Sequence, residues 1–491
     1  MVLALMQYAT GGRVAYTMDS LAYRDASVNF TAGHPMQSTN VMAPEPEYQP
    51  LLIWPPAYPA LWSSVAQLTH VEIDAVPSLL NPILLCVTTL SVFWICWRVT
   101  GSSTIACIVA TVNAFVPGSM IVYGHAWSET LFIPLLLLAY AAFWKYRMSK
   151  DKFIWLAAAA IFIGMANWTR YAGIVFIPIL GVSVLAASGA AFAKRILHAM
   201  GAILLGVALA LPLWLHNWQL AGNISGSTRG GAANGRLLQD VSTIVDLIEH
   251  SFFAFSMVLR ANLEIPIFIA ILYVTIRTFR RQGTQWLRPP EIWLPIIWSA
   301  GYLLFLLYAR TAQTGVPLDL RMLAVAFPFL LFAMAPAVKS AFSDHAFDTR
   351  KVLVILLLGL LINSGLFEAH GAHQNYASAG VPRWRSEFGL AFRDMRNTSP
   401  TSRALQESIG AVSPSTLILT DYRALYIRYL TGARVYSPYD TDCAHWKGNP
   451  EGLLLIGAAE LPAWAIDCLK TNPQWRLLRP VGRASPSMYA D

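Results

Sequence analysis

Long apolar runs alternate with short polar segments over most of this chain. Runs approaching 20 apolar residues are typical of helices that cross a bilayer, whose hydrocarbon core is about 30 Å thick, because a helix rises about 1.5 Å per residue. The pattern therefore predicts an all-α polytopic membrane bundle. The expected spans are 77–97, 102–122, 129–146, 153–168, 171–188, 196–215, 264–279, 292–308, 322–338 and 352–367.

A shorter apolar segment, Met1 to Ala9, opens the chain. About nine residues cannot cross a bilayer, and the segment has neither the basic start nor the cleavage site of a signal peptide. We interpret it as a first helix that is truncated because the start codon was assigned too far downstream. With it the bundle has about 11 transmembrane helices, and the amino terminus is expected inside and the carboxyl terminus outside.

Polar segments divide the chain into two predicted domains, a transmembrane module over 1–367 and an extracytoplasmic tail over 368–491. The module has a long first external loop, about 10–70, in which WPPAYP at Trp54–Pro59 forms the entry to an interfacial helix from Ala57 to Leu68. In the tail, Thr416–Thr420 and Gly452–Ile456 have the apolar character of short buried strands, and Asp421–Leu430 that of a helix. The tail is therefore expected to form a small α/β subdomain.

Composition agrees with a membrane protein. Charged residues make up 13% of the chain and hydrophobic residues 56%, with a mean hydropathy of +0.48, whereas a soluble domain usually has about 25% charged residues. The net charge of +8 is a topology signal rather than a nucleic-acid footprint, because the basic residues favour alternate loops, which the positive-inside rule makes cytoplasmic. The predicted cytoplasmic loops contain Arg98, Lys145, Arg147, Lys150, Lys152, Lys194, Arg195, Arg277, Arg280, Arg281, Arg288, Lys339, Arg350 and Lys351, and the opposite loops contain Arg170, Arg229, Arg236, Arg260, Arg310 and Arg321.

Two acids on the predicted external face are candidates for chemistry. Asp19 follows the first helix by a few residues, and Glu129 begins the span 129–146. Asp19 is either a helix N-cap or a carboxylate that activates an acceptor hydroxyl or holds a divalent metal. Glu129 either faces the positive end of its helix dipole or lines a polar cavity.

Two arginines, Arg170 and Arg321, lie on the same predicted face, against the positive-inside tendency. Such arginines can extend to lipid headgroups, but a guanidinium also binds phosphate oxygens in a forked geometry. The pair would suit a polyprenyl phosphate headgroup.

Cysteine usage adds one open question, because the tail contains Cys443 and Cys468, and the sequence leaves open whether they form a disulfide. The sequence shows no zinc-type His/Cys cluster.

Six short motifs follow one another in a familiar order: DSLAY at Asp19–Tyr23, YRDASVNFTAG at Tyr23–Gly33, WPPAYP, SETLF at Ser128–Phe132, TRYAG at Thr169–Gly173 and DLRML at Asp319–Leu323. Their order and common sidedness resemble the membrane-embedded GT-C glycosyltransferases, specifically the bacterial group that includes aminoarabinose transferases and relatives of protein O-mannosyltransferases. The resemblance covers Asp19 to Pro328.

The resemblance implies a polyprenyl-phosphate sugar as donor, an acceptor that is a lipid, a glycan or a protein, and inversion at the anomeric carbon. It assigns Asp19 as the essential acid, Arg321 as a contact to the lipid phosphate, and Glu129, Arg170 and Tyr23 as substrate-binding residues. No cofactor is certain, and a divalent metal remains open because Asp19 stands alone where some relatives have paired acids. The implied location is the bacterial inner membrane, among membrane lipids, with the catalytic face extracytoplasmic and no nucleic acid as partner.

Two other functions remain as alternatives. A transporter or flippase of lipid-linked saccharides would need charged residues at mid-membrane depth or broken helices, and the predicted helix centres contain almost no charge. A polysaccharide polymerase or ligase would use a similar donor, but such enzymes usually depend on a large loop late in the chain, whereas the motif-rich loop here comes first.

Overall fold

A computed structural model of the chain describes residues 14–40, 47–149, 152–187, 191–226, 241, 243–244, 290–312, 320–343, 416–420, 427, 434–436, 452–455 and 463–478. The contacts divide the chain into two compact units. The first, here called the bundle unit, consists of Met1–Arg13, Leu52–Tyr58 and Pro77–His373. The second unit consists of Val14–Leu51, Pro59–Val76 and Gln374–Asp491.

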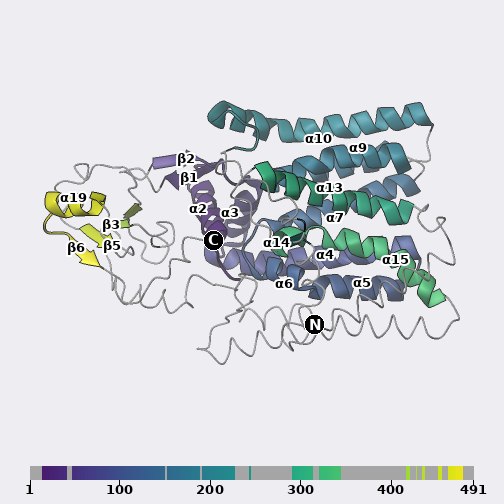
Figure 1. The fold of residues 1–491 in the computed structure, drawn as a ribbon, viewed down its shortest axis with the longest axis horizontal. Coiled ribbons are helices and arrows are strands. Elements are labelled where there is room, and N and C mark those ends of the chain that lie inside the picture. Colours follow the sequence, from purple (N-terminus) through teal and green to yellow (C-terminus); the bar gives the residue numbers. More distant parts are fainter. Residues whose placement is uncertain are drawn as a thin grey trace, which may run out of the picture. The chain divides into compact units, whose positions relative to one another are not determined.

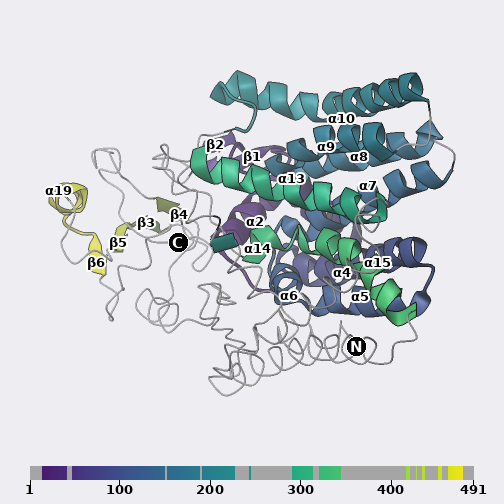
Figure 2. The same cartoon turned by 45° about the vertical axis from the view of Figure 1, so that its right-hand side comes forward.

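Helices make up the described part of the bundle unit, and Figure 1 shows α7, α9, α10 and α13 running side by side with nearly parallel axes. The turned view in Figure 2 shows the same arrangement. The helices are α4 (Val76–Thr100), α5 (Ser103–Phe115), α6 (Pro117–Gly124), α7 (Glu129–Met148), α8 (Phe153–Thr169), the 3-10 turn η2 (Tyr171–Val175), α9 (Phe176–Ala187), α10 (Phe192–Ala221), α13 (Pro290–Ala312), α14 (Leu320–Leu323) and α15 (Phe327–Ser343).

Within the described residues, four helical segments are long and apolar enough to cross a membrane: Ile73–Thr100, α7, α10 and Pro290–Arg310. A fifth is added if α5 and α6 form one bent span, and α8, η2 with α9, and part of α15 are shorter apolar helices. The prediction of a mostly helical membrane bundle is therefore confirmed. The expected first helix and the spans at 264–279 and 352–367 lie outside the described residues, so the count of about 11 stays a prediction.

Two spans predicted as continuous helices are broken. The expected helix 102–122 divides into α5 and α6, whose axes differ by 59°. Val116 is extended, with ψ of 131°, because a proline disfavours helical geometry in the residue before it, and Pro117 then begins α6. The expected helix 322–338 likewise divides into α14 and α15, with a turn at 324–326 just before Pro328. Both predictions of a continuous helix were wrong because hydropathy averaged over a segment does not detect a proline.

The two breaks lie against each other. A side chain at Gly118, in the first turn of α6, would approach the Phe327 ring to 2.4 Å and the Ala324 Cβ atom to 3.4 Å. The glycine therefore allows α6 to pack closely on the start of α15. This contact holds the short helices α6 and α14 near each other, and these two helices lead into the candidate site.

Close approach of small residues and stacking of aromatic rings hold the long helices together. A Cβ atom at Gly164 of α8 would lie 2.7 Å from the Cβ atom of Leu209 in α10, so these backbones are nearly in contact, as small residues permit in membrane helices. Between α7, α13 and α15, the Tyr140 ring lies 5.1 Å from the ring of Trp298 and 5.5 Å from that of Phe329. The core of the bundle unit is thus apolar and aromatic.

In the amino-terminal part of the second unit, a hairpin and a short turn pack on the helix α2 (Met18–Thr31). The hairpin consists of β1 (Gln37–Asn40) and β2 (Glu47–Pro50), and the turn is η1 (Ile73–Ala75). The carboxylate of Asp25 accepts hydrogen bonds from the backbone nitrogen and Oγ1 of Thr39 at 2.7 and 2.8 Å, which ties the hairpin to α2. Arg24 forms a forked ion pair with Asp74, at 2.5 and 3.1 Å, which ties η1 to the same helix. The helix predicted from Ala57 to Leu68 is confirmed as α3 (Ala57–Thr69), which begins in the bundle unit, while its interfacial location stays a prediction.

In the tail, the structure describes a four-stranded parallel sheet in the order β4-β3-β5-β6. The two predicted strands are confirmed as β3 and β5, while most of the expected helix Asp421–Leu430 lies outside the described residues. Cys468 in α19 is buried with Leu417 and Leu454 and is disulfide-bonded; Cys443 lies outside the described residues. The extent of the α/β subdomain over 368–491 stays a prediction. The elements are β3 (Leu417–Thr420), β4 (Arg434–Tyr436), β5 (Gly452–Leu455), α19 (Ala463–Thr471) and β6 (Arg476–Leu478).

Candidate functional site

The acid of the candidate site lies where the loop between α6 and α7 meets α7. Glu129 is the first residue of α7, and the loop before it is fixed from α4, where the Asn81 side-chain amide donates to the backbone oxygens of Tyr123 and His125 at 2.8 and 2.7 Å. The imidazole Nδ1 of His125 makes a hydrogen bond of 2.8 Å with the backbone oxygen of Ile121. These bonds satisfy carbonyl groups at the end of α6 and hold the position of the chain that leads to Glu129.

Arg170 enters the site from the turn between α8 and η2. It ends α8 in an extended conformation, with φ of −149° and ψ of 136°. The return of the chain depends on Gly173, where a Cβ atom would lie 2.6 Å from the backbone of Asn167, and the Gly173 amide donates to the Arg170 carbonyl at 2.9 Å. The glycine in the TRYAG motif therefore makes possible the tight turn that presents Arg170.

Arg321 enters from α14, the short helix before the second break. The Tyr302 hydroxyl of α13 donates to the backbone oxygen of Met322 at 3.0 Å, which fixes α14 against the bundle. The sulfur of Met322 lies 3.3 Å from Nη2 of Arg170, so the helix that carries one arginine also touches the other.

The two arginines meet at one carboxylate. Oε1 of Glu129 lies 2.6 Å from Nη1 of Arg170 and 3.2 Å from Nε of Arg321. The Glu129 side chain is 1% exposed, that of Arg170 17% and that of Arg321 10%. Ser128, the neighbour of Glu129, also holds Arg170, because its hydroxyl accepts a hydrogen bond of 3.2 Å from Nη1 of Arg170. Buried charges of opposite sign at this distance attract strongly, and removal of one partner from a buried pair costs about 3–5 kcal/mol.

Aromatic stacking orients Arg321. Its guanidinium carbon lies 4.7 Å from the centre of the Trp127 ring, and the His125 ring stacks on Trp127 with centres 4.0 Å apart and planes 6° apart. Burial lowers the pKa of His125 to about 3, with the Arg321 charge as a smaller cause in the same direction. His125 is therefore neutral at physiological pH, and it serves as an uncharged platform under Trp127.

Asp19 and Tyr23 lie in the second unit, in α2. Asp19 is half-buried in the first turn and is not the N-cap, because Thr17 and Ser20 form the capping box. The interpretation of Asp19 as a cap is therefore wrong. Tyr23 is buried, and its backbone oxygen accepts a hydrogen bond of 2.6 Å from Ser27. The structure thus brings together Glu129, Arg170 and Arg321, while the catalytic and substrate-binding roles of all five residues stay predictions.

The sequence did not point to Asn81 as a residue that positions the site, nor to the contact between the Trp127 ring and Arg321. Asn81 is a buried polar residue inside the apolar stretch of α4, and a polar residue within a membrane helix is a signal for a structural or functional contact. The stacking of Arg321 on Trp127 has no such signal, because residues so far apart in sequence meet only through the packing of α6 on α14. In the described part of the chain, no group of three or more His, Cys, Asp or Glu side chains is arranged to hold a metal ion.

Comparison with known proteins gives a structural match without a sequence match. No protein-family model matches the chain, and no curated protein matches its sequence. Two crystal structures of ArnT from Cupriavidus metallidurans are similar. The apo state has a TM-score of 0.54 at 11% identity, with 91% of this chain and 89% of that chain covered. The structure bound to undecaprenyl phosphate has a TM-score of 0.53 at 10% identity, with 96% and 87% covered.

The apo oligosaccharyltransferase of Archaeoglobus fulgidus is also similar, with a TM-score of 0.50 at 13% identity, and the match covers 90% of this chain but 64% of that one. At these identities the likeness concerns the fold. The chain has the fold of the GT-C membrane glycosyltransferases, so the resemblance that the motifs indicated is confirmed at the level of fold.

Proposed function

We propose that this protein transfers a sugar from a polyprenyl-phosphate donor to an acceptor at the extracytoplasmic face of a bacterial inner membrane. The observation that carries the proposal is the convergence of Arg170 and Arg321, from two distant helices, on the buried carboxylate of Glu129. Related folds support it, because the similar ArnT structure contains undecaprenyl phosphate. The predicted topology places this end of the bundle outside the cytoplasm.

The arginines suit the donor phosphate. A phosphate presents oxygens that a guanidinium binds in a forked geometry, and Arg321 is held by Trp127 on its face and by Glu129 at Nε. Glu129 keeps the two cations close together at one place before a donor arrives, at a distance where they would otherwise repel each other. In this proposal Arg321 contacts the phosphate, and Arg170 and Glu129 line the donor-binding cavity that the resemblance implies.

The reaction needs one further group. The acceptor hydroxyl attacks the anomeric carbon, the bond from that carbon to the phosphate oxygen breaks with inversion, and polyprenyl phosphate leaves with the bonding electrons. The hydroxyl proton passes to Asp19 as general base. Arginine contacts stabilise the charge that develops on the leaving phosphate. A divalent metal held by Asp19 would instead lower the pKa of the hydroxyl, and Tyr23 would contact the sugar.

The first test measures donor binding with undecaprenyl phosphate as the probe. Arg321→Lys keeps the charge but loses the forked geometry, so its Kd should rise about tenfold or more, since a hydrogen bond to a charged group contributes about 1.5–3 kcal/mol. Arg147→Lys is the matched control, because Arg147 also pairs with an acid and an aromatic ring, Glu291 and Trp144, outside the candidate site. Equal Kd values for the wild type and Arg321→Lys would overturn the phosphate assignment.

The second arm measures turnover with a panel of undecaprenyl-phosphate sugars. Asp19→Asn keeps the size of the side chain but removes its basicity, so turnover should fall about 100-fold or more while undecaprenyl phosphate still binds. The control is Asp467→Asn, the same change at an exposed acid of α19. Loss of wild-type turnover on addition of EDTA, and its return with a divalent cation, would assign Asp19 to a metal. Near-normal turnover by Asp19→Asn would contradict both roles.

A transporter of lipid-linked saccharides is the second candidate function, because the two broken helices are a feature that such proteins use. Their outer parts, α6 and α14, lead to the charged site, which favours transfer at one face over passage through the bilayer. Proteoliposomes with a labelled lipid-linked sugar in one leaflet distinguish the two. Movement of the label to the other leaflet without a new glycosidic bond would identify a transporter.

A further inference from the structure

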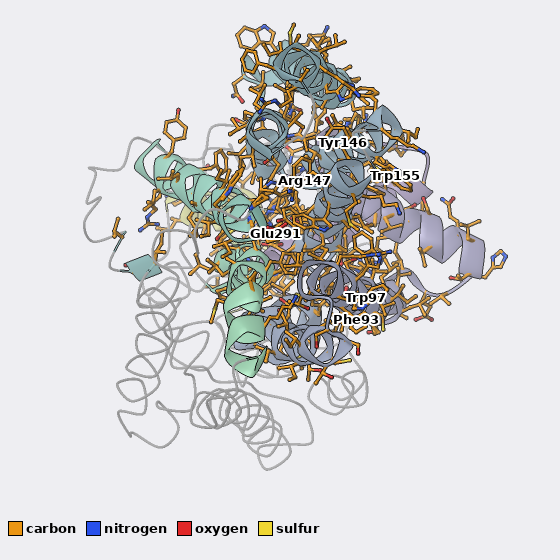
Figure 3. The ribbon with its side chains drawn as sticks, turned by 90° about the vertical axis from the view of Figure 1, so that its right-hand side faces the viewer. Phe93, Trp97, Tyr146, Arg147, Trp155 and Glu291 are labelled. Carbon is orange, nitrogen blue, oxygen red and sulfur yellow. The ribbon has the colours of Figure 1, made fainter. Side chains whose placement is uncertain are left out.

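The end of the bundle unit opposite the candidate site has a repeated pattern of cations held over aromatic rings. Arg98 of α4 lies 4.8 Å from the centre of the Trp97 ring and 5.5 Å from that of Trp94. Lys145 of α7 lies 5.7 Å from the ring of Trp155 in α8. We call Arg98, Trp97, Lys145 and Trp155 the basic end. Figure 3 looks onto this end and shows Trp97 and Trp155 with Arg147.

Two further pairs repeat the pattern at the same end. Arg147 lies 4.5 Å from the Trp144 ring, and Arg195 at the start of α10 lies 5.6 Å from the Phe192 ring. The Arg195 guanidinium also donates to the backbone oxygen of Leu185 at 2.9 Å, which caps the end of α9. The pairs come from four helices that are separate in sequence, so the pattern belongs to the end of the bundle and not to one segment.

The cations of the basic end are not neutralised by acids of the described chain. Among the described residues, the ion pair found at this end joins Arg147 to Glu291 at 4.0 Å, and neither Arg98 nor Lys145 forms one. A cation–π contact occupies the face of a guanidinium and leaves the N–H groups at its edge able to donate. The basic end therefore presents positive charge and hydrogen-bond donors outward.

The aromatic partners are exposed where an apolar surface begins. Trp97 is 39% exposed and Trp155 38%. Beyond them along the same helices lie exposed apolar side chains, including Leu90 in α4 and Ile161 in α8. Tryptophan prefers the depth at which hydrocarbon meets headgroups. The basic end consequently lies at headgroup depth, with its cations at the level of lipid phosphates.

We propose that the basic end is a binding surface for anionic phospholipid headgroups. The charge of the surface complements a lipid phosphate, and its rings and adjoining apolar helices complement the glycerol and acyl chains. A zwitterionic lipid presents the same acyl chains with a compensating positive group, so it binds more weakly. This surface is separate from the donor site, and its occupation does not depend on sugar transfer.

The test compares lipid binding by the intact protein in detergent. Native mass spectrometry with dioleoyl phosphatidylglycerol and dioleoyl phosphatidylcholine measures the ratio of their apparent affinities. The variant is Arg98→Gln with Lys145→Gln, and the matched control is Lys470→Gln with Arg476→Gln, which removes two cations from α19 and β6. Each basic residue near a lipid surface contributes about fivefold in binding, so the variant should lose about 25-fold in affinity for phosphatidylglycerol.

The control variant should bind both lipids as the wild type does, and inorganic phosphate at the lipid concentration should not displace phosphatidylglycerol. Equal affinity of the wild type for the two lipids would overturn the proposal. So would an unchanged affinity for phosphatidylglycerol in Arg98→Gln with Lys145→Gln. Undecaprenyl phosphate binding and turnover, measured on the same samples, report separately on the donor site.

Discussion

At the scale of single residues, the candidate site consists of one acid whose charge is shared by two arginines, and each arginine has a second support. Arg170 is held by Ser128, and Arg321 by the ring of Trp127. Preorganised donors of this kind cost little reorganisation when an anion binds. Trp127 is thus a positioning residue in the proposed function, since its contact with a donor would pass through Arg321.

Trp127 provides the residue-scale prediction. Trp127→Leu removes the cation–π contact and should raise the Kd for undecaprenyl phosphate about tenfold, while Trp127→Phe, which keeps a weaker ring face, should give an intermediate value. The same two changes at Trp144, which holds Arg147, are the matched control and should leave this Kd unchanged. Trp127→Phe and Trp127→Leu with equal effects on Kd would contradict a role for the ring face.

At the scale of elements, helix breaks and close helix contacts determine where the site residues lie. Pro117 ends the continuity of α5 with α6, and Gly118 lets α6 approach α15. The helices α8 and α10 also approach closely, because a Cβ atom at Gly164 would lie 2.7 Å from the Cβ atom of Leu209. The Trp168 indole adds a hydrogen bond of 2.8 Å to the Leu209 carbonyl. Because Arg170 follows α8 directly, the position of α8 determines the position of the arginine.

Gly164 provides the element-scale prediction. Gly164→Ala places a methyl group 2.7 Å from the Cβ atom of Leu209, which is fixed to its backbone, so α8 and α10 must separate at a cost of about 1–3 kcal/mol. Gly206→Ala is the control, because its Cβ atom would meet Ile177 at an ordinary distance of 3.4 Å. Thermal unfolding in detergent should show a lower midpoint for Gly164→Ala than for Gly206→Ala. The reverse order would mean that this interface is looser than the structure shows.

At the scale of the whole molecule, both proposals depend on the orientation of the bundle. The candidate site and the basic end lie at opposite ends of α7, which begins at Glu129 and contains Lys145 and Arg147 in its last turns. The loop charges predict that the basic end lies in the cytoplasmic leaflet, which attracts basic segments because its lipids are anionic. In the same predicted orientation Glu129 lies outside.

Topology provides the prediction for the whole molecule. A green fluorescent protein fused after Asp491, which folds only in the cytoplasm, should be dark, and alkaline phosphatase at the same place should be active, because the charge bias puts the tail outside. The matched fusions after Lys150, in the predicted cytoplasmic loop between α7 and α8, should give the opposite result. A fluorescent carboxyl-terminal fusion would show that the number of spans differs from 11 by an odd number.

The sequence by itself determined the membrane bundle, most of its helix positions and the acids and arginines worth testing. Length and apolarity suffice for this, because a helix in lipid must satisfy its own backbone hydrogen bonds and present apolar side chains. The strands β3 and β5 were predictable for a related reason, since short apolar runs between turn signals are typical of buried strands.

Only the tertiary structure decided which candidates meet. Glu129 begins α7, Arg170 follows α8 and Arg321 lies in α14. The distances between them depend on how these helices pack, which local patterns do not encode. The breaks at Pro117 and Pro328 were legible in the sequence, but the apolar runs continue across them, so hydropathy predicted unbroken spans. The stacking of His125 on Trp127 and of Trp127 on Arg321 joins segments that are distant in sequence. The packing of side chains in the folded protein decides such contacts.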